Sequence, residues 1–221
     1  MELTLVRHGQ STANRDGLLQ GRFDAPLSDL GQRQASQLGD WFAQRAMEWD
    51  AAYCSPLSRA RDTARIITER LGRAAATEDD DLAEIHVGSM QGKAARVLRV
   101  EHPSFYARAL DGLGDYAEFG GEAYDDVQQR VRRFIELIVA RHRTPAARVL
   151  VVSHGGLMFH LTKMLICQPV PRVMLIKFGN CSVTRLNLRE RRGAYMGEIE
   201  WHLPLDLIGG EPSGGAGSLL Y

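Results

Sequence analysis

The run from Arg148 to Val152 constrains the fold more than any other part of this chain. It is apolar at successive positions from 149 to 152 and does not alternate with polar residues. A short uninterrupted apolar run is typical of a strand that is covered on both faces of a parallel sheet. Polar residues from Ser153 to Gly156 follow at once, and helical spacing then continues to about residue 166. This segment predicts a strand, a loop and a helix.

Two earlier segments repeat the same order. Residues 2–6 form a short β-prone run, and apolar residues then recur at helical spacing over residues 31–46. Residues 51–54 form a second such run. A helix is expected from Ser55 to about Gly72, because serine is a favoured N-cap and the proline that follows it tolerates the first helical turn. Three units of this kind indicate a mostly parallel sheet.

Further elements complete the predicted fold class. A helix over residues 123–142 is expected to precede the third strand, so that β and α segments alternate through most of the chain. Residues 172–202 have the pattern of two or three more strands. We therefore expect an α/β protein, a three-layer sandwich whose mostly parallel central sheet carries helices on both faces.

The domain organisation is expected to be simple. Residues 1–205 should form one domain. Within it, residues 91–121 mix basic and aromatic side chains without regular spacing, and we expect an inserted, partly helical cap there; a solvated helical excursion is the alternative. Residues 206–221 include a stretch rich in Gly, Pro and Ser, and a flexible tail is expected.

Charge and cysteine content exclude several classes of protein. The 27 Lys and Arg residues balance 27 Asp and Glu residues, which argues against a nucleic-acid partner and means that any recognition of an anion must be local. The three cysteines are odd in number and widely spaced, so neither a disulfide framework nor a zinc site is suggested. We expect the reducing cytoplasm.

A membrane location is not expected. No apolar run approaches the roughly 18 residues that are needed to span a bilayer, and no basic region precedes the apolar residues near Met1.

Polar clusters follow all three predicted strands. They are residues 7–9, 55–61 and 153–156. In open α/β sheets, ligands bind beyond the carboxyl ends of the strands, where loops and helix N-termini converge. Two histidines, two or more arginines and backbone N–H groups would suit a tetrahedral dianion. Phosphate is therefore the expected ligand.

Five motifs occur in the order found in a known family. They are Leu5–Asn14, which contains Arg-His-Gly; Gln20–Ser28 with Gly31; Cys54–Ala60 with Thr63 and Ala64; Leu82–Ile85 with Gly88; and Val152–Gly156. A lone Arg-His-Gly would be weak evidence, but the ordered set is specific. The chain resembles the histidine phosphatase superfamily, in its phosphoglycerate mutase-like branch, from residue 3 to about residue 187.

This resemblance implies a role for each candidate site residue. His8 would be the nucleophile, Arg7, Arg59 and His154 would surround the phosphoryl oxygens, and Glu84 would be the proton donor. Asn14, Gln20, Gly21 and Gly155 would complete the set that binds the phosphoryl group. No metal or other cofactor is implied, because fixed cations can neutralise the charge on the transferring phosphoryl group in place of Mg²⁺.

Chemistry places a requirement on each of these residues. His8 must present a neutral ring nitrogen while a backbone carbonyl fixes the other nitrogen. His154 is expected to be protonated and to add positive charge. Glu84 must be protonated to donate to the leaving oxygen, and it can then, once ionised, activate the water that cleaves the phosphohistidine.

Two departures from the family pattern concern the substrate side. Met90 and Gln91 follow Gly88, where an aromatic residue and a glutamate are common. After the segment Gly120 to Glu122, Ala123 replaces a serine, so that any contact from that hydroxyl is absent. The alternative for Glu122 is a residue of a helix-start turn.

The predicted function is a phosphomonoester hydrolase that acts through a phosphohistidine on a small phosphorylated metabolite. The first alternative is a cofactor-dependent phosphoglycerate mutase, which would use a longer insertion with adjacent arginines than residues 91–121 provide. The second is a non-catalytic phosphate-binding or regulatory module. The expected partner is a small-molecule phosphate ester, and a homodimer is compatible with the sequence.

Overall fold

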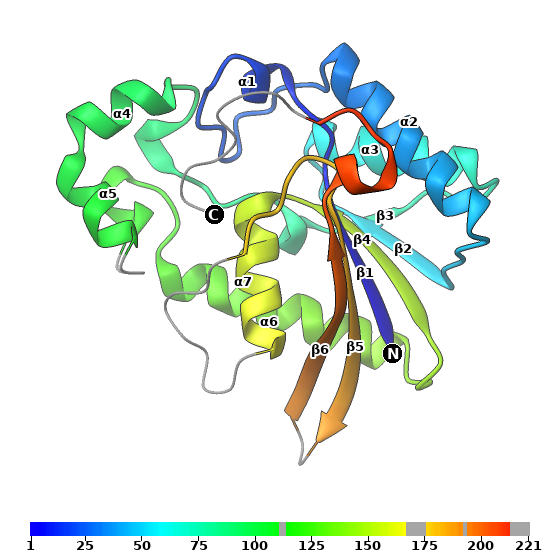
Figure 1. Ribbon diagram of the computed structural model, residues 1–221. Coiled ribbons are helices and arrows are strands. Elements are labelled where there is room, and N and C mark those ends of the chain that lie inside the picture. Colours follow the sequence, from blue (N-terminus) through cyan, green and yellow to red (C-terminus); the bar gives the residue numbers. More distant parts are fainter. Residues whose placement is uncertain (111–113, 167–175, 192–193, 213–221) are drawn as a thin grey trace.

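The computed structural model describes residues 1–110, 114–166, 176–191 and 194–212. These residues contain a six-stranded sheet in the order β3-β2-β4-β1-β5-β6 (Figure 1). The strands are β1 (Glu2–Arg7), β2 (Ala51–Cys54), β3 (Thr77–Glu78), β4 (Arg148–Ser153), β5 (Val183–Arg191) and β6 (Ala194–Leu203).

Most of the sheet is parallel, as predicted. β4 pairs in parallel with both β1 and β2, and β2 pairs in parallel with β3, whereas β5 runs antiparallel to its neighbours β1 and β6. The register sets Arg7 opposite Ser153 and Cys54 opposite Val152. The carboxyl ends of β1, β2 and β4 therefore meet at one edge of the sheet.

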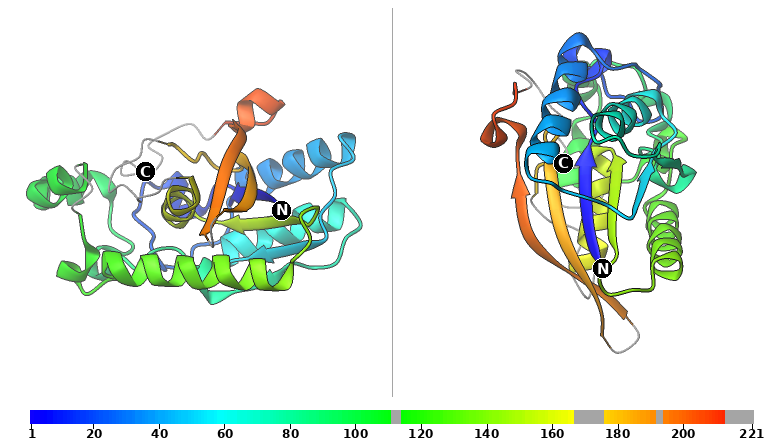
Figure 2. Two further views of the ribbon diagram at one scale, coloured as in Figure 1. Left: turned by 90° about the horizontal axis from the view of Figure 1, so that it is seen from below. Right: turned by 90° about the vertical axis from the view of Figure 1, so that its right-hand side faces the viewer.

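Helices cover both faces of the sheet. They are α1 (Thr12–Arg15), α2 (Asp29–Gln44), α3 (Ser58–Arg70), α4 (Ala95–Glu101), α5 (Pro103–Leu110), α6 (Tyr124–Arg141) and α7 (Gly155–Ile166), with the short 3-10 helices η1 (Asp80–Leu82), η2 (Gly88–Met90), η3 (Tyr116–Phe119) and η4 (Leu205–Ile208). Val6, Leu150 and Val152 pack with α2 and α3, while Leu5 and Val151 pack with α6 and α7. Figure 2 shows these two helix pairs on opposite sides of the sheet. The predicted three-layer sandwich is confirmed.

The start of α3 differs from the sequence-based expectation. The helix begins at Ser58 and not at Ser55. The hydroxyl of Ser55 accepts a hydrogen bond from the backbone N–H of Leu57 at 3.2 Å and also contacts a ring nitrogen of His154 at 2.7 Å. Ser55 therefore ends β2 by turning into the polar edge of the sheet, and the helix starts one turn later.

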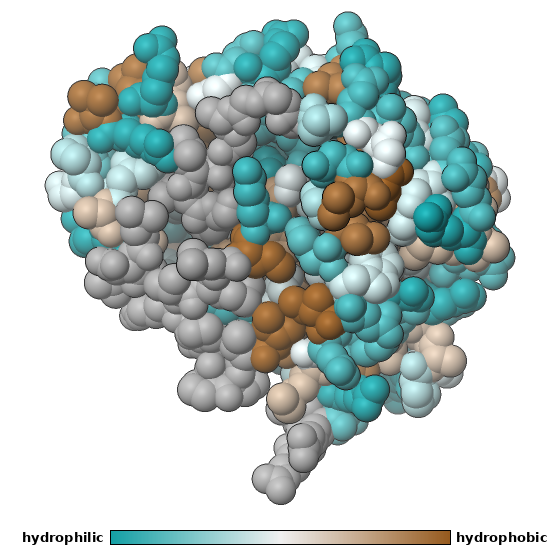
Figure 3. Space-filling view, in the orientation of Figure 1, coloured by the Kyte–Doolittle hydropathy of each residue, from teal (hydrophilic) through white to brown (hydrophobic). Residues whose placement is uncertain are grey.

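The segment expected to form a cap stands beside the sheet as α4, α5 and η3 (Figure 1). Its side chains Leu98, Phe105 and Tyr116 are buried in the same cluster as the α6 and α7 core. Val97 and Val100 of α4 are exposed, and Figure 3 shows hydrophobic surface over this helix. The segment therefore packs against the main core through one side only.

The C-terminal segment is described as far as residue 212. Leu205 of η4 is buried, and Glu211 makes an ion pair with Arg33 of α2 at 3.0 Å. Residues 206–212 of the expected tail thus lie against α2, and the rest of that tail lies outside the described residues. None of the helices in the described part of the chain is both long and apolar enough to cross a bilayer.

Candidate active site

The carboxyl ends of β1 and β4 bring two histidines together. Arg7 and Ser153 are the last residues of these strands, and the backbone N–H of His8 donates to the Ser153 carbonyl at 2.9 Å. The rings of His8 and His154 lie with their centroids 5.0 Å apart at an angle of 59°. Both side chains are almost fully buried. Parallel pairing therefore turns two distant motifs into neighbours.

His8 has the ring state that a nucleophile requires. Its Nδ1 lies 2.7 Å from the Gly9 carbonyl oxygen, which can only accept a hydrogen bond, so Nδ1 carries the proton and Nε2 keeps its lone pair. Burial, together with the charges of Arg59 and Arg7, holds the pKa of His8 well below its ordinary value of 6.5. The imidazole is therefore neutral near pH 7, as expected.

Gly9 is required for a packing reason. A Cβ atom at this position would lie 2.5 Å from the Gly31 carbonyl oxygen, which is closer than real Cβ contacts. The backbone N–H of Gly9 donates to Thr63 Oγ1 at 3.0 Å. The missing side chain thus lets the loop after β1 rest directly on the start of α2, and this contact holds His8 in place.

Two buried guanidinium groups flank His8. Arg7 donates to the Phe178 carbonyl at 2.5 Å, and Arg59 donates to the carbonyls of Gly21 and Phe23 at 2.8 and 3.0 Å. Their side chains are 6% and 1% exposed, and neither makes an ion pair within the described residues. The Nε atoms of both also lack a hydrogen-bond partner there. Both arginines line the same pocket as His8, so their guanidinium groups can meet an anion there.

The local charge is positive although the chain as a whole is neutral. Burial lowers the pKa of Arg7, and it lowers the pKa of Arg59 to about 10, so that both groups remain charged near pH 7. The carboxylate of Glu84 is the largest influence that raises the pKa of each arginine and so opposes the effect of burial. Two cations facing one carboxylate leave a net attraction for an anion.

The structure corrects the expected charge of His154. Burial, reinforced by the charges of Arg59 and Arg7, holds the pKa of His154 well below 6.5, so the ring is neutral. Its Nε2 lies 2.7 Å from Ser55 Oγ, and its Nδ1 has no partner among the described residues. A protonated ring would need an added negative charge nearby, because burial among cations opposes it.

Glu84 lies at the N-terminus of α7. Its carboxylate accepts hydrogen bonds from the backbone N–H groups of Gly156 and Leu157 at 3.1 and 3.0 Å, and from that of Ile85 at 2.9 Å. A helix N-terminus favours a negative charge. A Cβ atom at residue 156 would lie 2.7 Å from Glu84 Oε1, so glycine there allows this approach.

The remaining predicted residues are not all in the pocket. Asn14, Gln20 and Gly21 line it, whereas Gly155 is not among the lining residues and lies next to the Arg7 side chain. The Oδ1 atom of Asn14 accepts from Asn180 Nδ2 at 3.2 Å and from a backbone N–H, which leaves the amide nitrogen of Asn14 as a donor. The predicted contact from Gly155 therefore has no support in the pocket lining.

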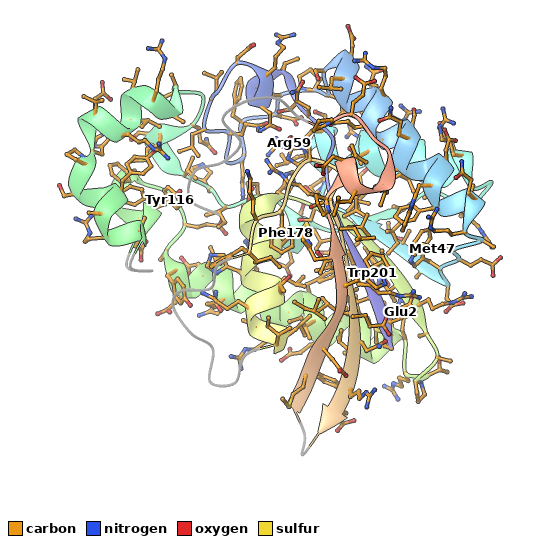
Figure 4. The ribbon with its side chains drawn as sticks, in the orientation of Figure 1. Glu2, Met47, Arg59, Tyr116, Phe178 and Trp201 are labelled. Atoms are coloured by element: carbon orange, nitrogen blue, oxygen red, sulfur yellow. The ribbon has the colours of Figure 1, made fainter. Side chains whose placement is uncertain are left out.

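The pocket extends from His8 towards the cap. Apolar walls come from Leu18, Leu19, Ile85 and Val87, and the far end is formed by Arg99, Tyr106 and Tyr116. Figure 4 shows Tyr116 on the side of the cap helices and Arg59 above the sheet. The guanidinium carbon of Arg99 lies 5.8 Å from the ring centre of Tyr106.

Two groups of these residues were not assigned to the site from the sequence. Arg99 and Tyr106 belong to the basic and aromatic segment that was expected to form the cap, so their composition was a usable signal. Asn180 donates to the His8 carbonyl at 3.0 Å, and the Phe178 carbonyl binds Arg7. Neither belongs to a helix or strand or to a recognised motif, so the sequence carried no signal for them.

Comparisons with known proteins agree with this geometry. A family model described as the histidine phosphatase superfamily (branch 1) matches residues 3–197. A metal-independent phosphoserine phosphatase from Arabidopsis thaliana is 32% identical over 192 residues, which cover 86% of this chain and 78% of that protein. A probable phosphoglycerate mutase from Salmonella paratyphi A is 28% identical over 190 residues, which cover 86% of each chain.

A solved structure gives the same result. The mycobacterial glucosyl-3-phosphoglycerate phosphatase in complex with VO₃ matches with a TM-score of 0.80 and 29% identity, over 90% of this chain and 97% of that one. The relatives named as phosphatases confirm the predicted class of enzyme, a phosphomonoester hydrolase. Because the family model covers most of the chain, the protein belongs to the histidine phosphatase superfamily, branch 1.

Proposed function

We propose that this protein hydrolyses a small phosphomonoester through a phosphohistidine formed at His8. The observation that carries the proposal is the Nδ1 contact with the Gly9 carbonyl, at 2.7 Å, beside the two unpaired guanidinium groups of Arg7 and Arg59. In the first step, the Nε2 lone pair forms the N–P bond while the P–O bond to the alcohol breaks. Arg7 and Arg59 neutralise the charge on the equatorial oxygens of the phosphoryl group.

Glu84 completes both proton transfers in this proposal. As a carboxylic acid it gives its proton to the leaving oxygen. As a carboxylate it then takes a proton from the water whose oxygen bonds to phosphorus, the N–P bond breaks, and inorganic phosphate and neutral His8 result. The N–H groups of Gly156 and Leu157 hold this carboxyl group at the start of α7.

The far end of the pocket supports a substrate with a second acidic group. Arg99 lines this end next to Tyr106 and makes no ion pair among the described residues. A guanidinium group that faces a pocket favours a carboxylate or a second phosphate. We therefore propose a phosphorylated carboxylic acid of metabolite size, with the phosphate at Arg7 and Arg59 and the acid at Arg99.

A phosphoglycerate mutase is the second candidate, because some relatives are named as mutases. A mutase must bind two phosphate groups and protect its phosphohistidine from water. Among the described residues that line the pocket, the segment 91–121 contributes a single cation, Arg99. One cation fits a carboxylate better than a phosphate dianion, which favours hydrolysis.

The test is turnover in the presence of EDTA. Purified protein should release phosphate from p-nitrophenyl phosphate and faster from O-phosphoserine, and His8→Ala should abolish acid-labile labelling with ³²P. Conversion of 3-phosphoglycerate that outpaces hydrolysis would identify a mutase. No turnover with phosphate still bound would identify a binding module, and normal labelling of His8→Ala would refute the nucleophile.

We also propose that the protein works in the reducing cytoplasm. The thiols of Cys54 and Cys181 are both buried and unpaired. Burial raises the pKa of both, that of Cys54 to about 12, so neither is a reactive thiolate. The thiols are therefore packing groups that need no oxidising compartment.

A further inference from the structure

The backbone that carries Glu84 is fixed by arginine side chains. It forms neither helix nor strand at this residue. The carbonyls of Asp81 and Ala83 accept hydrogen bonds from Arg130 Nη1 at 2.8 and 2.7 Å, and the Glu84 carbonyl accepts from Arg22 Nε at 3.2 Å. Irregular backbone needs such partners when it is withdrawn from water. The path of this loop thus depends on two side chains from distant parts of the chain.

Glu122 joins these arginines to the other side of the loop. Its Oε1 atom accepts from Arg130 Nε at 2.7 Å and from Arg22 Nη2 at 3.2 Å, and its Oε2 atom accepts from Arg130 Nη2 at 3.1 Å. The same Oε2 atom accepts from the backbone N–H of His86 at 2.7 Å. The backbone is therefore held before Glu84 by Arg130 and after Glu84 by Glu122, and these two side chains bind each other.

The glycines before Glu122 explain this position. The backbone N–H of Glu122 donates to the His86 carbonyl at 2.8 Å, and a Cβ atom at Gly121 would lie 2.3 Å from that same oxygen. A Cβ atom at Gly88 would lie 1.9 Å from the Phe119 carbonyl oxygen. The two segments thus touch backbone to backbone, which only glycine permits. This contact gives the Gly-Gly-Glu motif a structural purpose that the helix-start alternative lacks.

The ion pair at the centre of this network is largely buried. The side chain of Arg130 is 4% exposed and that of Glu122 is 15% exposed, whereas the two members of the surface pair Arg65–Glu69 are 54% and 61% exposed. Burial opposes the charge of Glu122, but the hydrogen bonds and charge of Arg130 hold its pKa below the ordinary value of 4.5. The two-point contact between guanidinium and carboxylate also fixes orientation.

We propose that Glu122 and Arg130 are positioning residues for Glu84. They fix the backbone on both sides of Glu84, so that its carboxyl group stays between the start of α7 and the pocket. Neither residue lines the pocket. The inference rests on the proposed function, in which Glu84 protonates the leaving oxygen, because a small displacement of a proton donor is costly to catalysis.

The test compares leaving groups. The variant Glu122→Gln should lower kcat/KM for O-phosphoserine by about tenfold or more, because kcat/KM reports the step in which the alkoxide leaves and an alkoxide needs a proton from Glu84. The same variant should lower kcat/KM for p-nitrophenyl phosphate by less than about threefold, since nitrophenolate leaves with little assistance. Combining Glu122→Gln with Glu84→Gln should add almost nothing to the selectivity change of Glu84→Gln alone. The exposed-pair variant Glu69→Gln is the matched control and should retain wild-type kinetics.

The outcomes separate positioning from folding and from the proposed function. Equal losses of kcat/KM with both substrates in folded Glu122→Gln, which leave the ratio of the two kcat/KM values unchanged, would overturn the inference. If Glu122→Gln does not fold, Arg22→Gln at the exposed end of the network should change the ratio in the same direction by about twofold to threefold. An unchanged ratio there would also overturn it. If the wild-type protein hydrolyses neither substrate, the proposed function itself has failed, which is seen before any variant is compared.

Discussion

Three histidines that are buried without charge should make the stability of this protein sensitive to mild acid. Burial, with nearby cations adding to it, holds the pKa of His8 and of His154 well below 6.5 and lowers that of His160 to about 3. In the unfolded chain each has its ordinary pKa near 6.5 and binds a proton as the pH falls. The unfolded state then holds more protons than the folded state, so the free energy of unfolding decreases towards acid.

The magnitude follows from the number of protons. Between about pH 7.5 and about pH 5.5, each such histidine should remove about 1.4 kcal/mol from the free energy of unfolding, or about 4 kcal/mol for the three together. This contribution to stability is fully present above about pH 6.5. It decreases as the pH falls below 6.5 and continues to decrease until the pH reaches the folded-state pKa values. The pKa of His202 is lowered in the same direction by burial. Carboxyl groups contribute little in this window, because their ordinary pKa values lie below it.

The assay is urea unfolding at the two pH values. The variant His160→Gln should reduce the pH-dependent loss by about 1.4 kcal/mol, because one of the three titrating groups is removed. Comparing each protein with itself at two pH values cancels any constant cost of the substitution. A total loss below about 1.5 kcal/mol would refute the buried neutral histidines and with them the neutral nucleophile at His8. The same loss in His160→Gln as in the wild type would refute the neutral state of His160.

Three further outcomes can be measured. Gly9→Ala should lower the free energy of unfolding by about 1–3 kcal/mol, because its Cβ would lie 2.5 Å from a carbonyl oxygen, while Gly179→Ala, which meets no atom within 4 Å, should change it by less than about 0.5 kcal/mol. Glu84→Gln should lower kcat for O-phosphoserine by about 10²–10³-fold but still allow labelling of His8 by p-nitrophenyl phosphate in a rapid-quench experiment. Arg99→Met should raise KM for O-phosphoserine by about tenfold and leave KM for p-nitrophenyl phosphate within about twofold, which a purely structural role for Arg99 would not produce.

The part of the site that could be predicted from sequence follows directly from the strands. Arg7, His8 and His154 stand at or just after the ends of β1 and β4, so the positions at which the apolar runs end already predicted them at one edge of the sheet. Ser55 shows the limit of this reasoning. It has the residue type of a helix N-cap, but its hydroxyl is used by His154, and α3 begins three residues later. The contact with His154, which lies far away in the sequence, therefore decides that Ser55 is not the N-cap of α3.

Other features depended on burial, which residue type alone does not reveal. The neutral state of His154 results first from burial and then from the charges of Arg59 and Arg7, and the three residues come from three separate segments of the chain. Asn180 reaches the His8 carbonyl across 172 positions of sequence. A pattern of apolar spacing carries no information about such a contact, because the residue lies outside any periodic element.

The arrangement of the buried arginines explains why the pocket selects an anion although the chain has no net charge. Arg130 makes an ion pair with Glu122, whereas Arg7 and Arg59 make no ion pair within the described residues and have only the longer-range attraction of Glu84. A buried ion pair exerts little field at a distance, and an unpaired buried cation exerts much more. The Glu122–Arg130 pair can therefore fix the loop of Glu84 without competing for the phosphoryl group. These two cations lie where the charge of the transferring phosphoryl group would be. A buried cation without an ion pair costs stability, which an anion in the pocket would restore.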